Sequence, residues 1–154
     1  MDGLDMFLAF IGAFVLLLVL IGIVLYVLLA IGLYQMAKNE NIEYEWFSFI
    51  PILQLYIIGK ILKEVKVLDY TVPKLELVLP LAPIATMILN VIPFIGWLLN
   101  LAYIVFSIIV MYYFFKRYKG EQATILTIVS VIFPFMFPIF IFSLRNAMPL
   151  TGRQ

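Results

Sequence analysis

Few side chains inside the apolar runs of this 154-residue chain could do chemistry, and two of them are amides. Asn90 and Asn100 each lie five residues from Ile95, so a turn centred there would place both amides at similar depth on adjacent helices. They would then hydrogen-bond to one another, and a bond of this kind within a membrane contributes about 0.6 kcal/mol on average. We expect the pair to clamp a helical hairpin, and contact with a solute is the alternative.

A second group forms a weakly polar face near the C-terminus. On an ideal helix its members lie within roughly 120° of one another: Thr124, Thr127, Ser130, Pro134 and Pro138. The two prolines free the carbonyls of Ser130 and Pro134 from the helical ladder, which predicts a bent helix. Because small hydroxyl side chains let helix backbones approach closely, we expect a helix-packing face. A groove for lipid, peptide or a cation is the alternative.

Composition excludes most catalytic chemistry. The chain has no Cys and no His, which removes thiol and imidazole catalysis and the usual ligands of zinc, copper and haem. No acidic or basic residue falls near the middle of a predicted span, where proton relays and voltage sensors need one. A net charge of +1 provides no patch for nucleic acid. We therefore predict that the protein is not an enzyme, that it has no catalytic residue, metal or cofactor, and that nucleic acid is not a partner.

Long apolar runs must position these residues. Hydrophobic residues make up 66% of the chain. Three runs reach the length of about 20 residues that a transmembrane helix needs: Leu4 to Tyr34, Leu77 to Phe115 and Ala123 to Leu144. The second run is about twice too long for one span, so it must fold back at its Pro93 and Gly96. The sequence predicts one all-α integral membrane domain, residues 1–154, with four transmembrane helices at about 6–34, 75–91, 96–115 and 123–144.

The window between the first two spans is polar and ends in an aromatic cluster that begins at Trp46. Such aromatic residues typically lie at the level of the lipid headgroups. Beyond the cluster, apolar residues recur at helical spacing and basic residues lie mostly on the opposite side: Lys60, Lys63 and Lys66. We expect a cytoplasmic amphipathic helix at about 46–68, with Trp46 and these lysines in contact with membrane lipid. Residues 46–62 are short for a span, so interfacial, re-entrant and spanning placements stay as alternatives.

The basic residues predict the orientation. In the four-span arrangement eight of them fall on one side: Lys38, Lys60, Lys63, Lys66, Lys74, Lys116, Arg117 and Lys119. Arg145 and Arg153 fall on the other side. Because basic loops stay in the cytoplasm, both termini are predicted to lie outside. The start of the chain is acidic and unlike a secretory signal, so we expect a multi-pass protein of a bacterial cytoplasmic membrane.

Two segments resemble known membrane proteins. The stretch from Gly32 to Asn39, followed by Trp46, Ile50 to Ile52 and Tyr56 to Lys60, resembles a segment in small uncharacterised integral membrane proteins of Gram-positive bacteria. The turn from Ile92 to Trp97 is similar to turns in small Tic20-like four-helix membrane proteins. The first resemblance implies a bacterial cytoplasmic membrane. Neither resemblance implies an activity.

These observations together predict a non-enzymatic function. We expect a small accessory, scaffold or immunity-type subunit that binds another membrane protein, or a second copy of itself, through apolar helix faces. The runner-up is a small transporter or a channel-like protein, in oligomeric form, whose path is lined by the bent last helix and the two asparagines.

Overall fold

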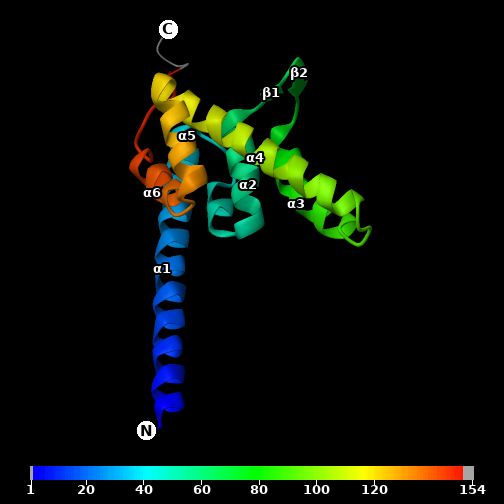
Figure 1. Cartoon of the computed structure of the whole chain (residues 1–154). Coiled ribbons are helices and arrows are strands. Elements are labelled where there is room, and N and C mark those ends of the chain that lie inside the picture. Colours follow the sequence, from blue (N-terminus) through cyan, green and yellow to red (C-terminus); the bar gives the residue numbers. More distant parts are fainter. Residues whose placement is uncertain (1, 151–154) are drawn as a thin grey trace.

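The computed structural model describes residues 2–150, whose regular secondary structure is helical apart from one short β-hairpin (Figure 1). The helices are α1 (Gly3–Asn39), η1 (Glu45–Phe49), α2 (Pro51–Leu62), α3 (Leu75–Leu89), α4 (Ile95–Lys119), η2 (Gly120–Gln122), α5 (Ala123–Ile132) and α6 (Met136–Ser143). The two strands are β1 (Val65–Val67) and β2 (Tyr70–Val72). The mainly helical class is therefore confirmed.

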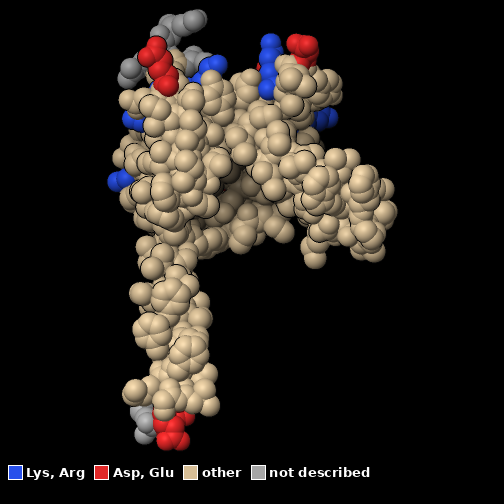
Figure 2. Space-filling view, viewed as in Figure 1, with Lys and Arg blue, Asp and Glu red and all other residues tan. Residues whose placement is uncertain are grey.

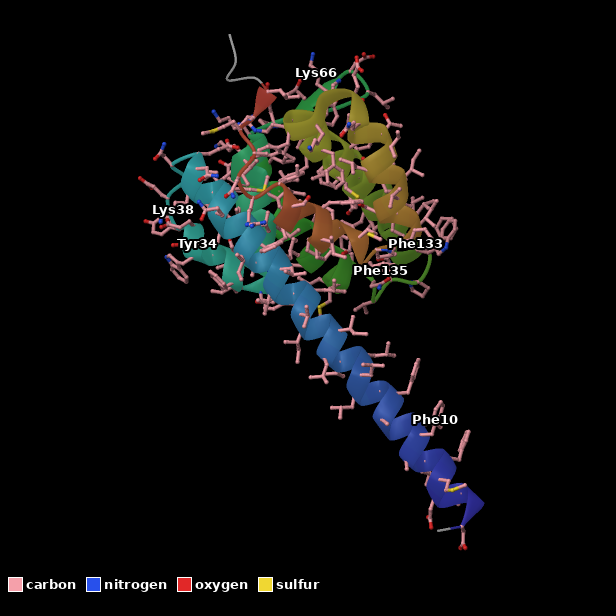
Figure 3. All side chains as sticks on the ribbon, turned by 90° about the vertical axis from the view of Figure 1, so that its left-hand side faces the viewer. Phe10, Tyr34, Lys38, Lys66, Phe133 and Phe135 are labelled. Atoms are coloured by element: carbon pink, nitrogen blue, oxygen red, sulfur yellow. The ribbon has the colours of Figure 1, made fainter. Side chains whose placement is uncertain are left out.

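Helix α1 has two halves with different surroundings. Its 37 residues extend about 55 Å at 1.5 Å per residue. Residues 3–24 are all exposed and project from the rest of the molecule, which we call the body (Figures 1 and 3). Phe10, on this projecting half, is 71% exposed. The other half is packed into the body, where Leu33 and Met36 are buried.

Helix α2 lies inside the body. Ile57, Ile58 and Ile61 are buried on different sides of the helix. Gly59 permits a close crossing with α3, because a Cβ at this position would lie 2.4 Å from the Cα of Glu76. The prediction that the apolar face of this helix contacts lipid is therefore wrong for these three isoleucines, which pack inside the body, whereas Lys60 on the polar face stays partly exposed.

The predicted helix at 46–68 also ends early, at Leu62. Lys63 adopts φ 66° and ψ −58°, and the Glu64 amide bonds to the Leu62 carbonyl at 2.8 Å, which is the geometry of a classic γ-turn. The chain then forms an antiparallel hairpin in which Val65 pairs with Val72. Valine favours strands, and this local pairing replaced the helix that the spacing of apolar residues predicted.

The second apolar run folds back on itself, as its length predicts. Helix α3 ends at Leu89 and α4 begins at Ile95, and the two pack as a hairpin that projects sideways from the body (Figure 1). A Cβ on Gly96 would lie 2.3 Å from the Asn90 side-chain oxygen, so this glycine permits the tight turn.

The third apolar run is not one bent span. Helix α5 ends at Ile132, the chain reverses over residues 133–135, and α6 returns beside α1. Pro134 permits the reversal, because it comes directly after the C-cap of α5 and has no amide to continue the helical ladder, whereas Pro138 lies in the first turn of α6, where a missing amide is tolerated. The Asn39 side chain donates a hydrogen bond of 2.9 Å to the Arg145 carbonyl. Arg145 therefore lies on the same side as Lys38, and the prediction that it lies opposite is wrong. Arg153 lies outside the described residues.

Two helical segments of the described chain are long and apolar enough to cross a membrane: Gly3–Asn39 and Ile95–Ile132. The second comprises α4, η2 and α5 and turns at Gly120, which has φ 53°. Helices α2 and α3 are apolar but shorter. Since α5 and α6 have only 10 and 8 residues, neither reaches the length of a span.

Candidate functional site

The charged side chains are segregated along the molecule. Figure 2 shows acidic atoms at the free end of α1, where Asp2 and Asp5 lie, and the remaining charges on the body. In Figure 3, Lys66 lies at the end of the body opposite Phe10, while Phe133 and Phe135 lie on the edge nearest the projecting half of α1. The body therefore has a charged end and an apolar edge.

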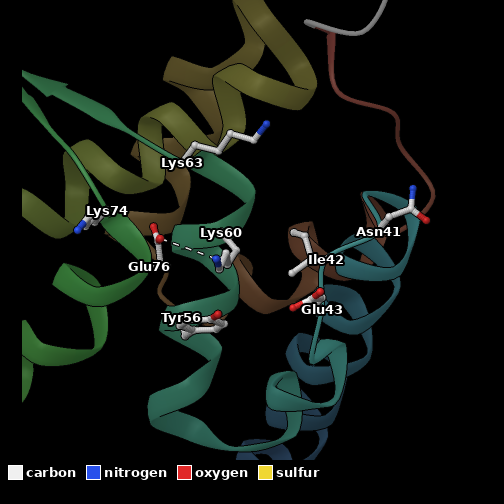
Figure 4. A pocket seen from close by; sticks show the side chains of 8 residues that line it. All are labelled: Asn41, Ile42, Glu43, Tyr56, Lys60, Lys63, Lys74 and Glu76. Carbon is white, nitrogen blue, oxygen red and sulfur yellow. Dashed lines mark ion pairs between the residues drawn. The ribbon is translucent and has the colours of Figure 1, made fainter.

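A pocket of about 430 Å³ opens at the charged end (Figure 4). Its walls come from the loop after α1, from the C-terminal part of α2 and from the start of α3. The lining residues are Asn41, Ile42, Glu43, Tyr56, Lys60, Lys63, Lys74 and Glu76. Lys60 forms an ion pair with Glu76 at 3.8 Å and lies over the Tyr56 ring, 5.5 Å from its centroid. Lys63 and Lys74 are exposed and have no carboxylate partner within 4 Å among residues 2–150.

The backbone around this pocket is strained. Asn41, Lys63 and Lys74 all have positive φ values, of 53°, 66° and 50°, which cost energy in residues other than glycine. Lys63 and Lys74 flank the β-hairpin, and the Leu75 amide donates to the Lys63 carbonyl at 3.4 Å, so the two lysine backbones lie side by side. Their side chains extend away from each other, as expected for like charges (Figure 4).

A second pocket, of about 700 Å³, adjoins the first and shares Lys63 and Lys74. Its lining residues are Leu62, Lys63, Glu64, Pro73, Lys74, Arg117 and Pro149. Three basic residues against one acidic residue make this the more cationic of the two pockets. Either pocket can hold an anionic group, because ammonium and guanidinium donors bind phosphate and carboxylate oxygens strongly.

A buried charged cluster fixes one wall of the second pocket, and sequence reasoning did not identify it. Arg117 Nη2 lies 2.6 Å from Glu40 Oε2, and the Tyr118 hydroxyl donates to Glu40 Oε1. The Glu40 and Arg117 side chains are only 13% and 19% exposed. The cluster joins the C-terminal ends of α1 and α4. One signal in the sequence could have indicated it. The segments that begin at Lys38 and at Lys116 were both predicted on the same side of the membrane, so an acidic residue of the first could pair with a basic residue of the second.

The structure brings the two predicted amides together. Asn100 Nδ2 donates a hydrogen bond of 3.0 Å to Asn90 Oδ1 at the tip of the α3–α4 hairpin. The predicted contact is thus present. Its contribution to stability stays a prediction.

The predicted weakly polar face is divided, because α5 ends before the prolines. Thr127 is buried and donates to the Ala123 carbonyl at 2.8 Å, and Ser130 is buried with no hydrogen-bond partner for its hydroxyl among residues 2–150. Thr124 is exposed, Pro134 lies in the turn, and Pro138 lies in the first turn of α6. Thr127 and Ser130 are packed against other residues, as expected for a helix-packing face. The alternative of one continuous groove along all five residues is wrong, because they do not lie on one helix.

The predicted lipid-contact residues do not share one helix. Trp46 is exposed on η1, Lys60 is on α2, Lys63 is in the γ-turn and Lys66 is on β1. Lys60 and Lys63 both line the first pocket, together with Lys74, which the sequence analysis did not assign to this group. Pairing of the strands brings Lys74 next to Lys63, and helical periodicity carries no signal for such a contact.

Two further findings bear on the class of protein. No cluster of three or more His, Cys, Asp or Glu side chains that could hold a metal ion occurs within residues 2–150. No protein-family model, curated protein or solved structure matches this chain.

Proposed function

We propose that the chain is a non-enzymatic accessory subunit of a membrane, in which α1 crosses the bilayer and the body occupies one leaflet. The observation that carries the proposal is the projecting half of α1. All its residues from 3 to 24 are exposed, and nearly all are apolar around the whole circumference. A helix that is apolar on every side requires lipid or another protein around it.

The length of α1 fits a crossing. Asp5 and Lys38 are 33 residues apart, about 50 Å along a helix. A bilayer is about 40–45 Å thick across its headgroups, so a tilted α1 places both charged residues at the two interfaces.

The body reaches only part of this depth. The Tyr26 hydroxyl donates to the Phe49 carbonyl, which sets the turn before α2 level with Tyr26, about 18 Å from Lys38. Gly32 packs on Ile141, and α6 begins five residues before Ile141, so residues 133–135 turn at a similar level. Since the hydrocarbon core is about 30 Å thick, we place both reversals near its middle.

The turn between α3 and α4 also suits an apolar environment. Its side chains include Val91 and Phe94, which are 83% and 78% exposed. Polypeptide backbone in hydrocarbon must satisfy its own hydrogen bonds. At the α3–α4 tip the Ile92 and Gly96 amides bond to backbone carbonyls, and in the last reversal the Met136 amide does so. This arrangement replaces the four-span prediction with one crossing helix and hairpins that enter and leave on the same side.

The accessory role rests on the same helix. A partner with an apolar transmembrane helix can pack against residues 3–24, because this half of α1 is exposed along its length. The transport alternative used the last helix and the two asparagines to line a path. In the proposed placement α5 and α6 turn back at the level of Tyr26, and the amides of Asn90 and Asn100 bond to each other, so these elements do not form one polar path across the bilayer.

Single cysteines test the topology, since the chain has no native Cys. In sealed vesicles, Met148→Cys and Asn41→Cys should react with a membrane-impermeant maleimide from one side, and Asp2→Cys from the other. Phe135→Cys should stay unreactive from both sides. Labelling of Met148→Cys together with Asp2→Cys would restore the four-span arrangement and contradict ours.

Photocrosslinking tests the partner. A crosslinker at Leu16, in the projecting half, should capture a discrete membrane protein in native membranes, whereas one at Leu33, which is buried, should capture nothing outside the chain. Capture of lipid alone at Leu16, with solute flux through vesicles holding only this chain, would favour transport instead.

A further inference from the structure

An apolar groove runs along the α3–α4 hairpin. Its volume is about 310 Å³. It is lined by Val72, Val78, Ala82, Ala85, Thr86, Leu89, Leu99, Ala102, Tyr103 and Phe106. The Thr86 hydroxyl is bonded to the Pro83 carbonyl at 2.9 Å, so it presents no unpaired donor to the groove. Small side chains at Ala82, Ala85 and Ala102 create the hollow between the two helices.

The groove and the second basic pocket are lined by neighbouring residues of the chain. Val72 lines the groove, and the next two residues, Pro73 and Lys74, line the pocket. Lys74 is the N-cap of α3, and Val78 and Ala82 follow it at intervals of four residues on one helix face. Lys74 therefore lies at the N-terminal end of the α3 face that forms the apolar wall of the groove.

The length of the groove is compatible with one leaflet. From Val78 to Leu89 it follows α3 for 11 residues, about 16 Å along the helix axis, and because the hairpin is inclined to α1 (Figure 1) it spans less than this along the bilayer normal, within the roughly 15 Å of one hydrocarbon leaflet. The charged end of the body lies at the interface in our topology. The basic pocket is complementary to an anionic head group, and the apolar groove is complementary to an apolar tail of this length.

We propose that this site binds a single anionic phospholipid, with its phosphate at Lys63, Lys74 and Arg117 and one acyl chain along the α3–α4 groove. Lys63 and Lys74 are free to turn their ammonium groups toward the phosphate, because neither has a carboxylate partner within 4 Å among the described residues. Arg117 is held in place by Glu40 and adds a donor at the pocket wall. The proposal rests on the membrane placement proposed above and names a ligand for it.

Lipid retention measures this binding. The full chain is purified in mild detergent, incubated with a mixture of phosphatidylglycerol and phosphatidylcholine, and examined by native mass spectrometry. One phosphatidylglycerol should be retained in preference to phosphatidylcholine. Lys74→Gln should weaken retention about tenfold, because one charge-assisted hydrogen bond to the phosphate is lost. Lys119→Gln is the matched control, since Lys119 is exposed, loses the same charge and lines neither pocket nor groove.

Groove variants test the acyl chain separately. Ala85→Phe should fill the exposed groove and reduce retention of phosphatidylglycerol at least tenfold, and Ala102→Phe should do the same from the opposite wall. Ala13→Phe makes the same change on the projecting half of α1, where retention should not change. The two groove variants provide a check, because they act from different helices and a folding defect in one leaves the other informative.

Three results would overturn the proposal. Equal retention of phosphatidylcholine would show that charge does not select the ligand. Retention insensitive to both groove variants, with inorganic phosphate displacing the lipid, would indicate a phosphate site without an acyl-chain site. A protein crosslinked at Ala85 in place of lipid would assign the groove to a helix. The cysteine labelling above does not depend on any of these outcomes, so failure of the lipid site and failure of the topology are distinguishable.

Discussion

The two halves of α1 have the same apolar chemistry and opposite surroundings. Gly12 and Gly22 have no atom within 4 Å of where a Cβ would be, whereas a Cβ on Gly32 would lie 2.9 Å from the Ile141 side chain and 3.0 Å from its backbone. Residues 3–24 are all exposed, and Leu33, Met36 and Ala37 form part of the core. The difference shows that apolar composition alone does not distinguish a surface for lipid or a partner from an internal packing surface.

Substitution of the glycines should have different consequences in the two halves of α1. Gly32→Val should lower the free energy of unfolding by about 3 kcal/mol, because the new side chain meets the backbone of α6 and overpacks the contact. Unfolding by SDS titration in mixed micelles provides the measurement. Gly22→Val introduces the same residue in the same helix in open space and should change stability by less than about 0.5 kcal/mol. Equal losses in the two variants would mean that the halves do not differ in packing.

The sequence was sufficient for the elements whose length or turn residues allow only one arrangement. The run from Leu77 to Phe115 is too long for one span, and Pro93 and Gly96 mark its turn, so the hairpin followed. The Asn90–Asn100 contact followed from the same turn. Such inferences rest on helix geometry and on local breaks in the chain, which sequence displays directly.

Three features depended on contacts that the sequence does not display. The prolines at 134 and 138 permit a bend or a reversal, and packing of α6 on Gly32 selects the reversal. Val65 and Leu68 fit helical spacing, but pairing of Val65 with Val72 forms strands. The basic pocket requires Lys63 and Lys74, which only that strand pairing brings together. In each case a tertiary contact decided between two locally allowed conformations.

The packed half of α1 also ends in the buried charged cluster of Glu40, Arg117 and Tyr118. Glu40→Gln should lower the free energy of unfolding by about 2 kcal/mol, since the ion pair with Arg117 is lost while the guanidinium stays largely buried. The measurement is the same SDS titration. Glu43→Gln is the matched control, because Glu43 is exposed in the same polar window and forms no ion pair within 4 Å among the described residues. A loss in Glu43→Gln equal to that in Glu40→Gln would show that net charge, not the buried pair, controls stability.

The smallest expected effect concerns the hairpin tip, which resembles the projecting half of α1 in its exposure but holds one internal polar contact. A double-mutant cycle with Asn90→Leu and Asn100→Leu should give a coupling energy of about 0.6 kcal/mol, the average for hydrogen bonds between membrane helices. Asn146→Leu, at an exposed position in the C-terminal segment, is the control for loss of an amide and should show no coupling with Asn90→Leu. The value should be the same in detergent and in lipid bicelles if the tip lies in hydrocarbon in both. A coupling that disappears in bicelles would place the tip at a hydrated headgroup layer, where water competes for both amides, and would remove the tip from the membrane interior.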